Sequence, residues 1–151
     1  MLHSQEAIDH QWVERLVRAT RAVCGQTAAA QLADAHLRAL RASVEQACRV
    51  PTSSGWERKA VAHAEIFNVL SDLAADPLTR SELSGGTAAA YDLMIGAGGA
   101  ADRITANSRR RFLARLRAAE WDEAALEMEK HLRILHFMGR LAGPAARGTA
   151  R

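Results

Sequence analysis

The sequence has few of the residues that build sheets, disulfide frameworks or membrane spans. Three prolines, two cysteines and 5% aromatic residues accompany an apolar fraction of 48%, which is mostly alanine and leucine. No alternating strand pattern occurs, and no apolar run reaches membrane-spanning length. Cys24 and Cys48 are too few for a disulfide framework and are expected to be small buried hydrophobes. These features argue against a β-protein, a disulfide-rich secreted domain and a membrane protein.

The net charge and the N-terminal residues further limit the class of protein to which this chain can belong. The net charge is only +3, and the arginines are scattered apart from the run 109–111. Such a run on a helix is more typical of a solvated face than of a nucleic-acid contact. Residues 1–10 are polar and lack the apolar region of a signal peptide, which predicts a cytoplasmic protein.

Apolar residues recur at helical spacing along the whole chain, and caps separate the stretches. The predicted helices cover 4–23, 28–48, 57–75, 77–95 with a break at 84–86, 102–118 and 122–141. Gly25 is expected to end the first helix, Asp76 to cap the fourth, and Gly143 with Pro144 to stop the last. The prediction is one all-α domain over 1–144, an antiparallel bundle of six or seven helices, with a disordered tail over 145–151.

The stretch 119–132 carries the most specific pattern in the chain. A turn, Ala119-Glu120-Trp121-Asp122, is followed by a small residue, Ala124, by Met128, and by the pair His131-Leu132. This spacing resembles the last two helices of the FCD domain, the effector-binding domain of many GntR-type bacterial transcription regulators. The resemblance extends in helix order and spacing over roughly residues 9 to 140.

The resemblance implies a function and partners. It implies a ligand-binding and dimerisation domain that senses a small-molecule effector, is not an enzyme and forms a homodimer. In the family a winged-helix DNA-binding domain precedes this domain. Nothing in the chain matches that module, so we expect no sequence-specific DNA binding by this chain alone.

The positions of the family's metal ligands are mostly changed in this sequence. By alignment they fall at Ala64, Asn68, Arg109 and His131, so one of four ligands remains. One imidazole does not bind a divalent ion tightly, and an inward Arg109 attracts an anion through its bidentate fork. The resemblance therefore favours direct binding of an acidic metabolite by Asn68, Arg109 and His131, with a metal at His131 disfavoured. If Arg109 points outward, the site is merely degenerate.

Two other classes of protein stay open. The first is a metal-binding helical bundle, possibly an enzyme, that uses His63, Glu65 and His131. His63 is nevertheless expected at the surface, because it lies about 100° from Ala64 on an ideal helix. The second class is an interaction module with a solid core and no pocket. A catalytic constellation is not evident, because no Ser-His-Asp order with a strained nucleophile elbow occurs and neither cysteine has a paired histidine at helical spacing.

Overall fold

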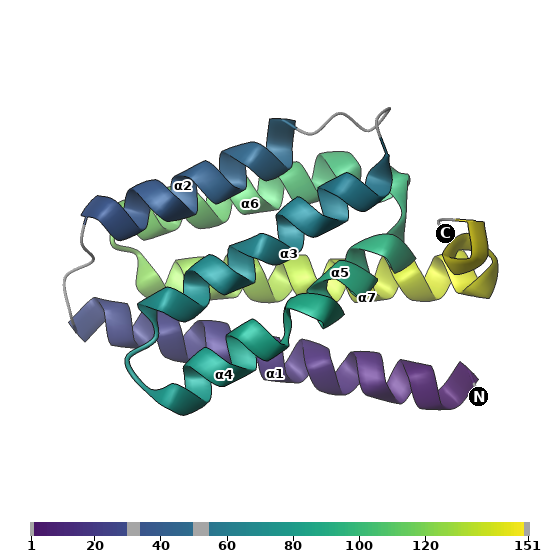
Figure 1. The fold of residues 1–151 in the computed structure, drawn as a ribbon, viewed down its shortest axis with the longest axis horizontal. Helices are drawn as coiled ribbons and strands as arrows, with labels where there is room; N and C mark the ends of the chain where they lie inside the picture. Colours follow the sequence, from purple (N-terminus) through teal and green to yellow (C-terminus); the bar gives the residue numbers. More distant parts are fainter. Residues whose placement is uncertain (1, 30–33, 50–54, 150–151) are drawn as a thin grey trace.

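The computed structural model describes residues 2–29, 34–49 and 55–149. All regular structure in these ranges is helical, so the all-α prediction is confirmed (Figure 1). The elements are α1 Leu2–Ala29, α2 Asp34–Arg49, α3 Trp56–Leu73, α4 Pro77–Gly85, α5 Thr87–Ala97, the short 3-10 helix η2 Gly99–Ala101, α6 Asp102–Arg117 and α7 Trp121–Thr149.

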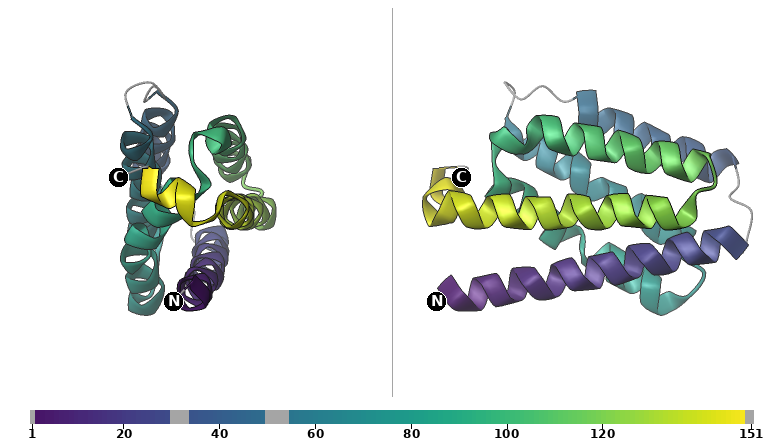
Figure 2. Two further views of the ribbon diagram at one scale, coloured as in Figure 1. Left: turned by 90° about the vertical axis from the view of Figure 1, so that its right-hand side faces the viewer. Right: turned by 180° about the vertical axis from the view of Figure 1, so that it is seen from behind.

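The helices form two layers that pack face to face (Figure 2). One layer contains α6, α7 and α1 side by side, and the other contains α2 and α3 with α4 and α5 beyond them. Across the layers α2 contacts α6, α5 contacts α7, and α1 contacts α4. The core therefore lies between a layer built from the middle of the chain and a layer built from its two end regions.

Helix α3 is covered on several sides, because α2, α4 and α5 all pack against it. Its buried residues accordingly span a wide arc of the helix. They are Lys59, Ala60, His63, Ala64, Ile66, Phe67, Leu70 and Ser71. Val61 lies outside this arc and is 60% exposed.

Two predicted breaks are confirmed by their backbone geometry. Asp76 caps α4, since its carboxylate accepts a hydrogen bond from the Thr79 amide at 2.9 Å and Pro77 occupies the first turn. Gly98 ends α5 with a φ of 76°, a left-handed conformation that glycine adopts at little cost. The breaks let α4, α5 and α6 turn back across the bundle.

The predicted end of the first helix was wrong. Helix α1 continues through Gly25 to Ala29, and the Thr27 hydroxyl donates within α1 to the carbonyls of Val23 and Cys24 at 3.0 and 2.9 Å. A glycine inside a helix costs only about 1 kcal/mol relative to alanine. Cys24 and Thr27 are both buried, so tertiary packing on either side of Gly25 offsets that cost.

The predicted stop of the last helix also differs from the structure. Helix α7 extends past Gly143 and Pro144 to Thr149, where a disordered tail was expected. Proline inside a helix removes one backbone hydrogen bond and clashes with the preceding turn, which kinks the helix where it does not end it. Figure 1 shows the last turns of α7 curling away from the axis of the helix.

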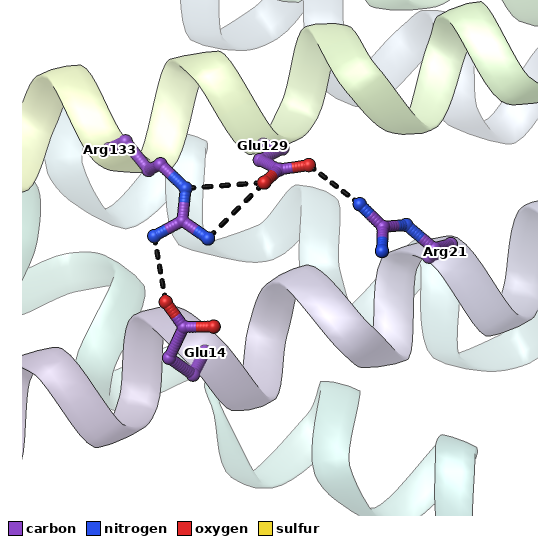
Figure 3. Close-up of polar contacts among 4 residues, drawn as sticks. All are labelled: Glu14, Arg21, Glu129 and Arg133. Atoms are coloured by element: carbon purple, nitrogen blue, oxygen red, sulfur yellow. Dashed lines mark hydrogen bonds and ion pairs between the residues drawn. The ribbon is translucent and has the colours of Figure 1, made fainter.

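Surface ion pairs join α1 to α7 along one side of the bundle (Figure 3). The Arg133 guanidinium donates to Glu14 at 2.7 Å and to Glu129 at 3.2 Å, and Arg21 donates to Glu129 at 2.7 Å. Exposed pairs of this kind contribute at most about 1 kcal/mol each. They therefore add little to the stability of the fold.

No helix among the described residues combines the length and the apolar character that crossing a membrane requires.

Candidate functional site

Arg109 is the largest fully buried side chain in the described part of the protein. It lies on α6 and is 1% exposed. The sequence left open whether Arg109 points inward, and the structure shows that it does. Its neighbours Arg110 and Arg111 are exposed, so the three-arginine run is divided between the core and the surface.

Two histidines and a serine lie with Arg109 between the two helix layers. His63 comes from α3, His131 from α7 and Ser108 from α6, and their exposed fractions are 0%, 2% and 2%. The His63 and His131 Nε2 atoms are 3.3 Å apart, and their ring centroids are 4.7 Å apart. We call Arg109, His63, His131 and Ser108 the buried polar cluster.

The hydrogen bonds of the buried polar cluster fix the position of each proton. Arg109 Nη1 donates to His63 Nδ1 at 3.4 Å, because a guanidinium has no acceptor. His63 therefore carries its proton on Nε2 and donates to His131 Nε2, which leaves the His131 proton on Nδ1. That proton is donated to Ser108 Oγ at 2.5 Å, and the Ser108 hydroxyl donates to the Thr105 carbonyl at 3.1 Å.

Reversing the direction of these hydrogen bonds would produce an unfavourable contact between Arg109 and His63. If Ser108 donated to His131, His63 would accept at Nε2 and carry its proton on Nδ1, facing an Arg109 N–H. Two donors would then oppose each other in a buried place, which costs about 1–3 kcal/mol for each unsatisfied group. The structure therefore assigns one neutral tautomer to each histidine.

Both imidazoles are kept neutral by their surroundings. Burial lowers the pKa of His63 well below its ordinary value of 6.5, and the nearby His131 and Arg109 lower it further. Burial also lowers the pKa of His131 to about 3, with smaller contributions from Arg109 and Arg111. The positive charge of the buried polar cluster thus resides on Arg109.

The guanidinium of Arg109 is incompletely hydrogen-bonded. Burial lowers its pKa from 12.5, yet an arginine side chain remains protonated in proteins. Within the described chain, its Nε and Nη2 atoms are buried and lack hydrogen-bond partners. These two N–H groups point the same way and form the fork that accepts a carboxylate or phosphate bidentately.

Two further residues act on the guanidinium from nearby. Cys48 on α2 and Asp102 on α6 both act to raise the pKa of the guanidinium and partly offset the effect of its burial. The Asp102 carboxylate accepts a hydrogen bond at 2.5 Å from Lys59, which is 4% exposed. Cys48 and Asp102 are partly exposed, whereas both histidines are buried.

The structure brings together two of the three predicted ligand-binding residues. Arg109 and His131 are both in the buried polar cluster, but Asn68 is not, because its amide donates to Glu65 at 3.0 Å on the exposed side of α3. The alignment was wrong about which residues of α3 face the site. His63, expected at the surface, occupies that place, and Glu65 is exposed.

The sequence analysis considered His131 as a metal ligand, and the structure places one further potential ligand next to it. His131 meets His63, but the described residues contain no group of three or more His, Cys, Asp or Glu side chains that could hold a metal ion. Glu65, the other ligand considered from the sequence, is exposed and accepts a hydrogen bond from Asn68. A metal ion here would have two imidazole ligands and Arg109 beside it.

Sequence reasoning missed Ser108, Lys59 and Cys48 at this site, and it considered His63 only as an alternative metal ligand that it expected at the surface. A signal for His63 was present, because it lies four residues before Phe67 and seven before Leu70, both fully buried. Lys59 is one turn before His63 on the same face. Ser108 and Cys48 have no comparable signal, since a serine beside an arginine and a cysteine at a helix end are common.

Comparison of the chain with protein-family models, with curated proteins and with solved structures gives no match.

Proposed function

We propose that this protein is a small-molecule-binding domain that senses a small carboxylate, with Arg109 as the charge partner of the ligand. The unpartnered Nε–Nη2 edge of the fully buried Arg109 is the observation that carries this proposal. The resemblance to FCD domains supports the same role, that of a cytoplasmic effector-binding domain in a GntR-type transcription regulator, and not an enzyme.

The energetics of a buried charge support an anionic ligand. An ion taken out of water into a protein interior costs several kcal/mol unless an opposite charge and hydrogen bonds compensate it. The hydrogen-bond partner of Arg109 in the described chain is the neutral His63 imidazole, and the Asp102 carboxylate that attracts the guanidinium is already paired with Lys59. A carboxylate on the fork would satisfy both N–H groups and neutralise the charge at once.

The charge balance of the site favours a singly charged anion. His63 and His131 are neutral, and Lys59 is paired with Asp102. One positive charge therefore remains, on Arg109. A monocarboxylate matches that charge, whereas a phosphate dianion would leave a buried negative charge without a partner.

Calorimetric titration with a panel of organic acids tests the proposal on the native protein and two matched variants. Arg109→Gln removes the fork, and Arg110→Gln removes the charge of the exposed neighbouring arginine. We expect one acid to bind the native and Arg110→Gln proteins alike. Binding to Arg109→Gln should weaken by about 1.5–3 kcal/mol, the strength of a hydrogen bond to a charged group. Equal binding to all three proteins would contradict the proposal.

The geometry of the two histidines favours a second candidate, a metal site. An Nε2–Nε2 separation of 3.3 Å is also what two imidazoles show when both bind one tetrahedral ion at about 2.0–2.1 Å. The adjacent guanidinium opposes a cation, which is why we favour the carboxylate. Stoichiometric zinc or nickel surviving purification without added metal would reverse this preference.

We also propose that the protein forms a homodimer and does not bind specific DNA by itself. Four exposed apolar residues of α7 lie within about 80° of one another on an ideal helix. They are Leu126, Ile134, Phe137 and Leu141. A second copy packing on this face would cover them. Light scattering at tens of micromolar should give a dimer mass that Phe137→Glu reduces to that of a monomer, and a native monomer would contradict the proposal.

A further inference from the structure

The positive charge of this protein is concentrated on two helices that lie next to each other. Helices α2 and α6 are in contact at the edge of the bundle opposite α1 (Figure 2). Together they contain nine arginines and three acidic residues, which gives them a net charge of +6. The whole chain has a net charge of only +3, so the remaining residues together carry −3. The edge formed by α2 and α6 is therefore strongly basic, whereas the rest of the protein is acidic.

Six of these nine arginines are exposed and form no ion pair with any residue that the structure describes. The other three are engaged, because Arg109 is buried and Arg111 and Arg115 pair with Glu127 and Glu120 at 3.1 and 2.6 Å. We call the six exposed, unpaired arginines the basic edge. They are Arg38, Arg41 and Arg49 on α2 and Arg103, Arg110 and Arg117 on α6.

The arginines of the basic edge form one line on each helix. Those on α6 are seven residues apart, so they lie within about 40° of one another and about 10.5 Å apart along the helix axis. Those on α2 lie within about 80° of one another. The line on α6 is about 80–120° around the helix from Arg111, which pairs with α7, so it faces the α2 side. In the described part of the two helices, Glu45 is the one acidic residue that is fully exposed.

A surface of this kind matches a partner with regularly spaced phosphates. Guanidinium groups bind phosphate oxygens through two parallel hydrogen bonds. The line on α6 spans about 21 Å, and duplex DNA carries about twelve phosphates over that length, roughly half of them on one side. The six arginines of the basic edge can therefore meet about six phosphates.

The other residues of the two helices favour duplex DNA over a membrane or a single strand. Membrane-surface helices carry large apolar residues beside their basic ones. Between the arginines of α6 the exposed residues are Asn107 and Ala114, and Ile104 lies about 100° from Arg103. Single strands bind through exposed aromatic rings on which their bases stack. Phe112 is the one Phe, Tyr or Trp on α2 and α6, and it is 1% exposed.

We propose that the basic edge binds the phosphate backbone of double-stranded DNA without reading its sequence. None of its six arginines belongs to the buried polar cluster, so the contact is independent of the proposed carboxylate site. It adds a sequence-independent contact to a domain that we expect not to bind specific DNA by itself.

Fluorescence anisotropy with two labelled duplexes of about 20 base pairs and unrelated sequence tests the proposal on the full chain. At 50 mM salt both duplexes should bind, with Kd values within about twofold of each other. The slope of log affinity against log salt concentration should be about −5, as about six phosphate contacts predict. No binding of either duplex, or a tenfold preference for one of them, would overturn the proposal.

Two triple variants with the same loss of charge assign the contact to the basic edge. The first replaces the line on α6, and its salt slope should be smaller in magnitude by about three. It is Arg103→Gln, Arg110→Gln and Arg117→Gln. The second removes three exposed cations of α1 and α7 and should keep the native slope. It is Arg15→Gln, Arg18→Gln and Lys130→Gln. Equal slopes in the two variants would refute the assignment.

Vesicles that contain phosphatidylserine test the alternative partner, an anionic membrane. We expect the native protein not to sediment with them at the salt concentration at which it binds DNA. Sedimentation with vesicles without binding of either duplex would overturn the proposal in favour of a membrane surface. The calorimetric titration with carboxylates uses a different part of the molecule, so failure of the DNA contact leaves the proposed function standing.

Discussion

His63 and His131 face each other through their Nε2 atoms, 3.3 Å apart, and neither ring reaches solvent. Two like groups form a hydrogen bond only if one donates and the other accepts. The donor at one end of the pair, Arg109, and the Ser108 hydroxyl at the other end decide which histidine donates. The Arg109 guanidinium on α6 therefore determines which ring nitrogen carries the proton in His63 on α3 and in His131 on α7.

The first prediction concerns the tautomers of these two rings. His63 should carry its proton on Nε2 and His131 on Nδ1, because Arg109 can only donate to His63. Long-range nitrogen–proton NMR spectra of the imidazoles near neutral pH distinguish the two neutral tautomers from each other and from imidazolium. Finding both rings in the same tautomer, or either one protonated, would refute the assigned direction of donation.

The second prediction concerns stability in acid. The pKa of each histidine is lower in the folded than in the unfolded state, where it is near 6.5. Below pH 6.5 the unfolded state binds more protons than the folded state. The stabilisation by the neutral histidines is therefore complete above pH 6.5 and is lost as the pH falls. For His131 this loss continues down to its folded pKa of about 3. The free energy of unfolding should decrease by about 1.4 kcal/mol per pH unit for each histidine.

Denaturant unfolding across this pH range provides the measurement. A His131→Gln variant should show a shallower slope, since one of the two titrating groups is gone. His36→Gln, at an exposed position on α2, is the matched control and should keep the native slope. A native slope unchanged by His131→Gln would count against the buried neutral pair.

The third prediction concerns the contact between α1 and the break that separates α4 from α5. An added Cβ at Gly86 would lie 2.3 Å from Leu16 Cδ2 and 3.0 Å from the Glu82 carbonyl oxygen. Leu16 is fully buried and cannot move aside freely. Gly86→Ala should therefore lower the free energy of unfolding by about 1–3 kcal/mol, the usual cost of overpacking.

Gly25 provides the matched control for this substitution. A Cβ there meets nothing within 4 Å, and the residue lies inside α1. Gly25→Ala should raise the free energy of unfolding by about 0.5–1 kcal/mol, because alanine loses less backbone entropy in a helix. Destabilisation by Gly25→Ala would show that α1 does not continue through this residue.

The sequence predicts the fold well because most helix stripes and caps act locally. Asp76 and Pro77 begin α4, and Gly98 ends α5, through contacts within a few residues. The ends of α1 and α7 are exceptions. At Gly25 and Pro144 the helix continues against local preference, because tertiary packing and helix bending are not visible in a short stretch of sequence.

The candidate site was predicted only in part, for a physical reason. Arg109 and His131 were found because their spacing matches a known pattern, whereas Asn68 was placed wrongly. The placement of Asn68 assumed that only the side of α3 that carries Ala64 is buried. Helix α3 is in fact packed on several sides, so His63 is buried too. The fraction of a helix surface that is buried depends on how many helices pack around it. The periodicity of the sequence does not show that number.

The central claim is that Arg109 is a buried cation whose fork binds a carboxylate. Denaturant unfolding of the native protein and of Arg109→Met, with and without the carboxylate found by calorimetry, tests it most directly. Without ligand, Arg109→Met should be at least as stable as the native protein, because methionine fills similar space and carries no charge to desolvate. At a hundredfold excess over Kd, the carboxylate should stabilise the native protein by about 2.7 kcal/mol and the variant not at all. An Arg109→Met protein several kcal/mol less stable than native, or one stabilised equally by the carboxylate, would contradict the account.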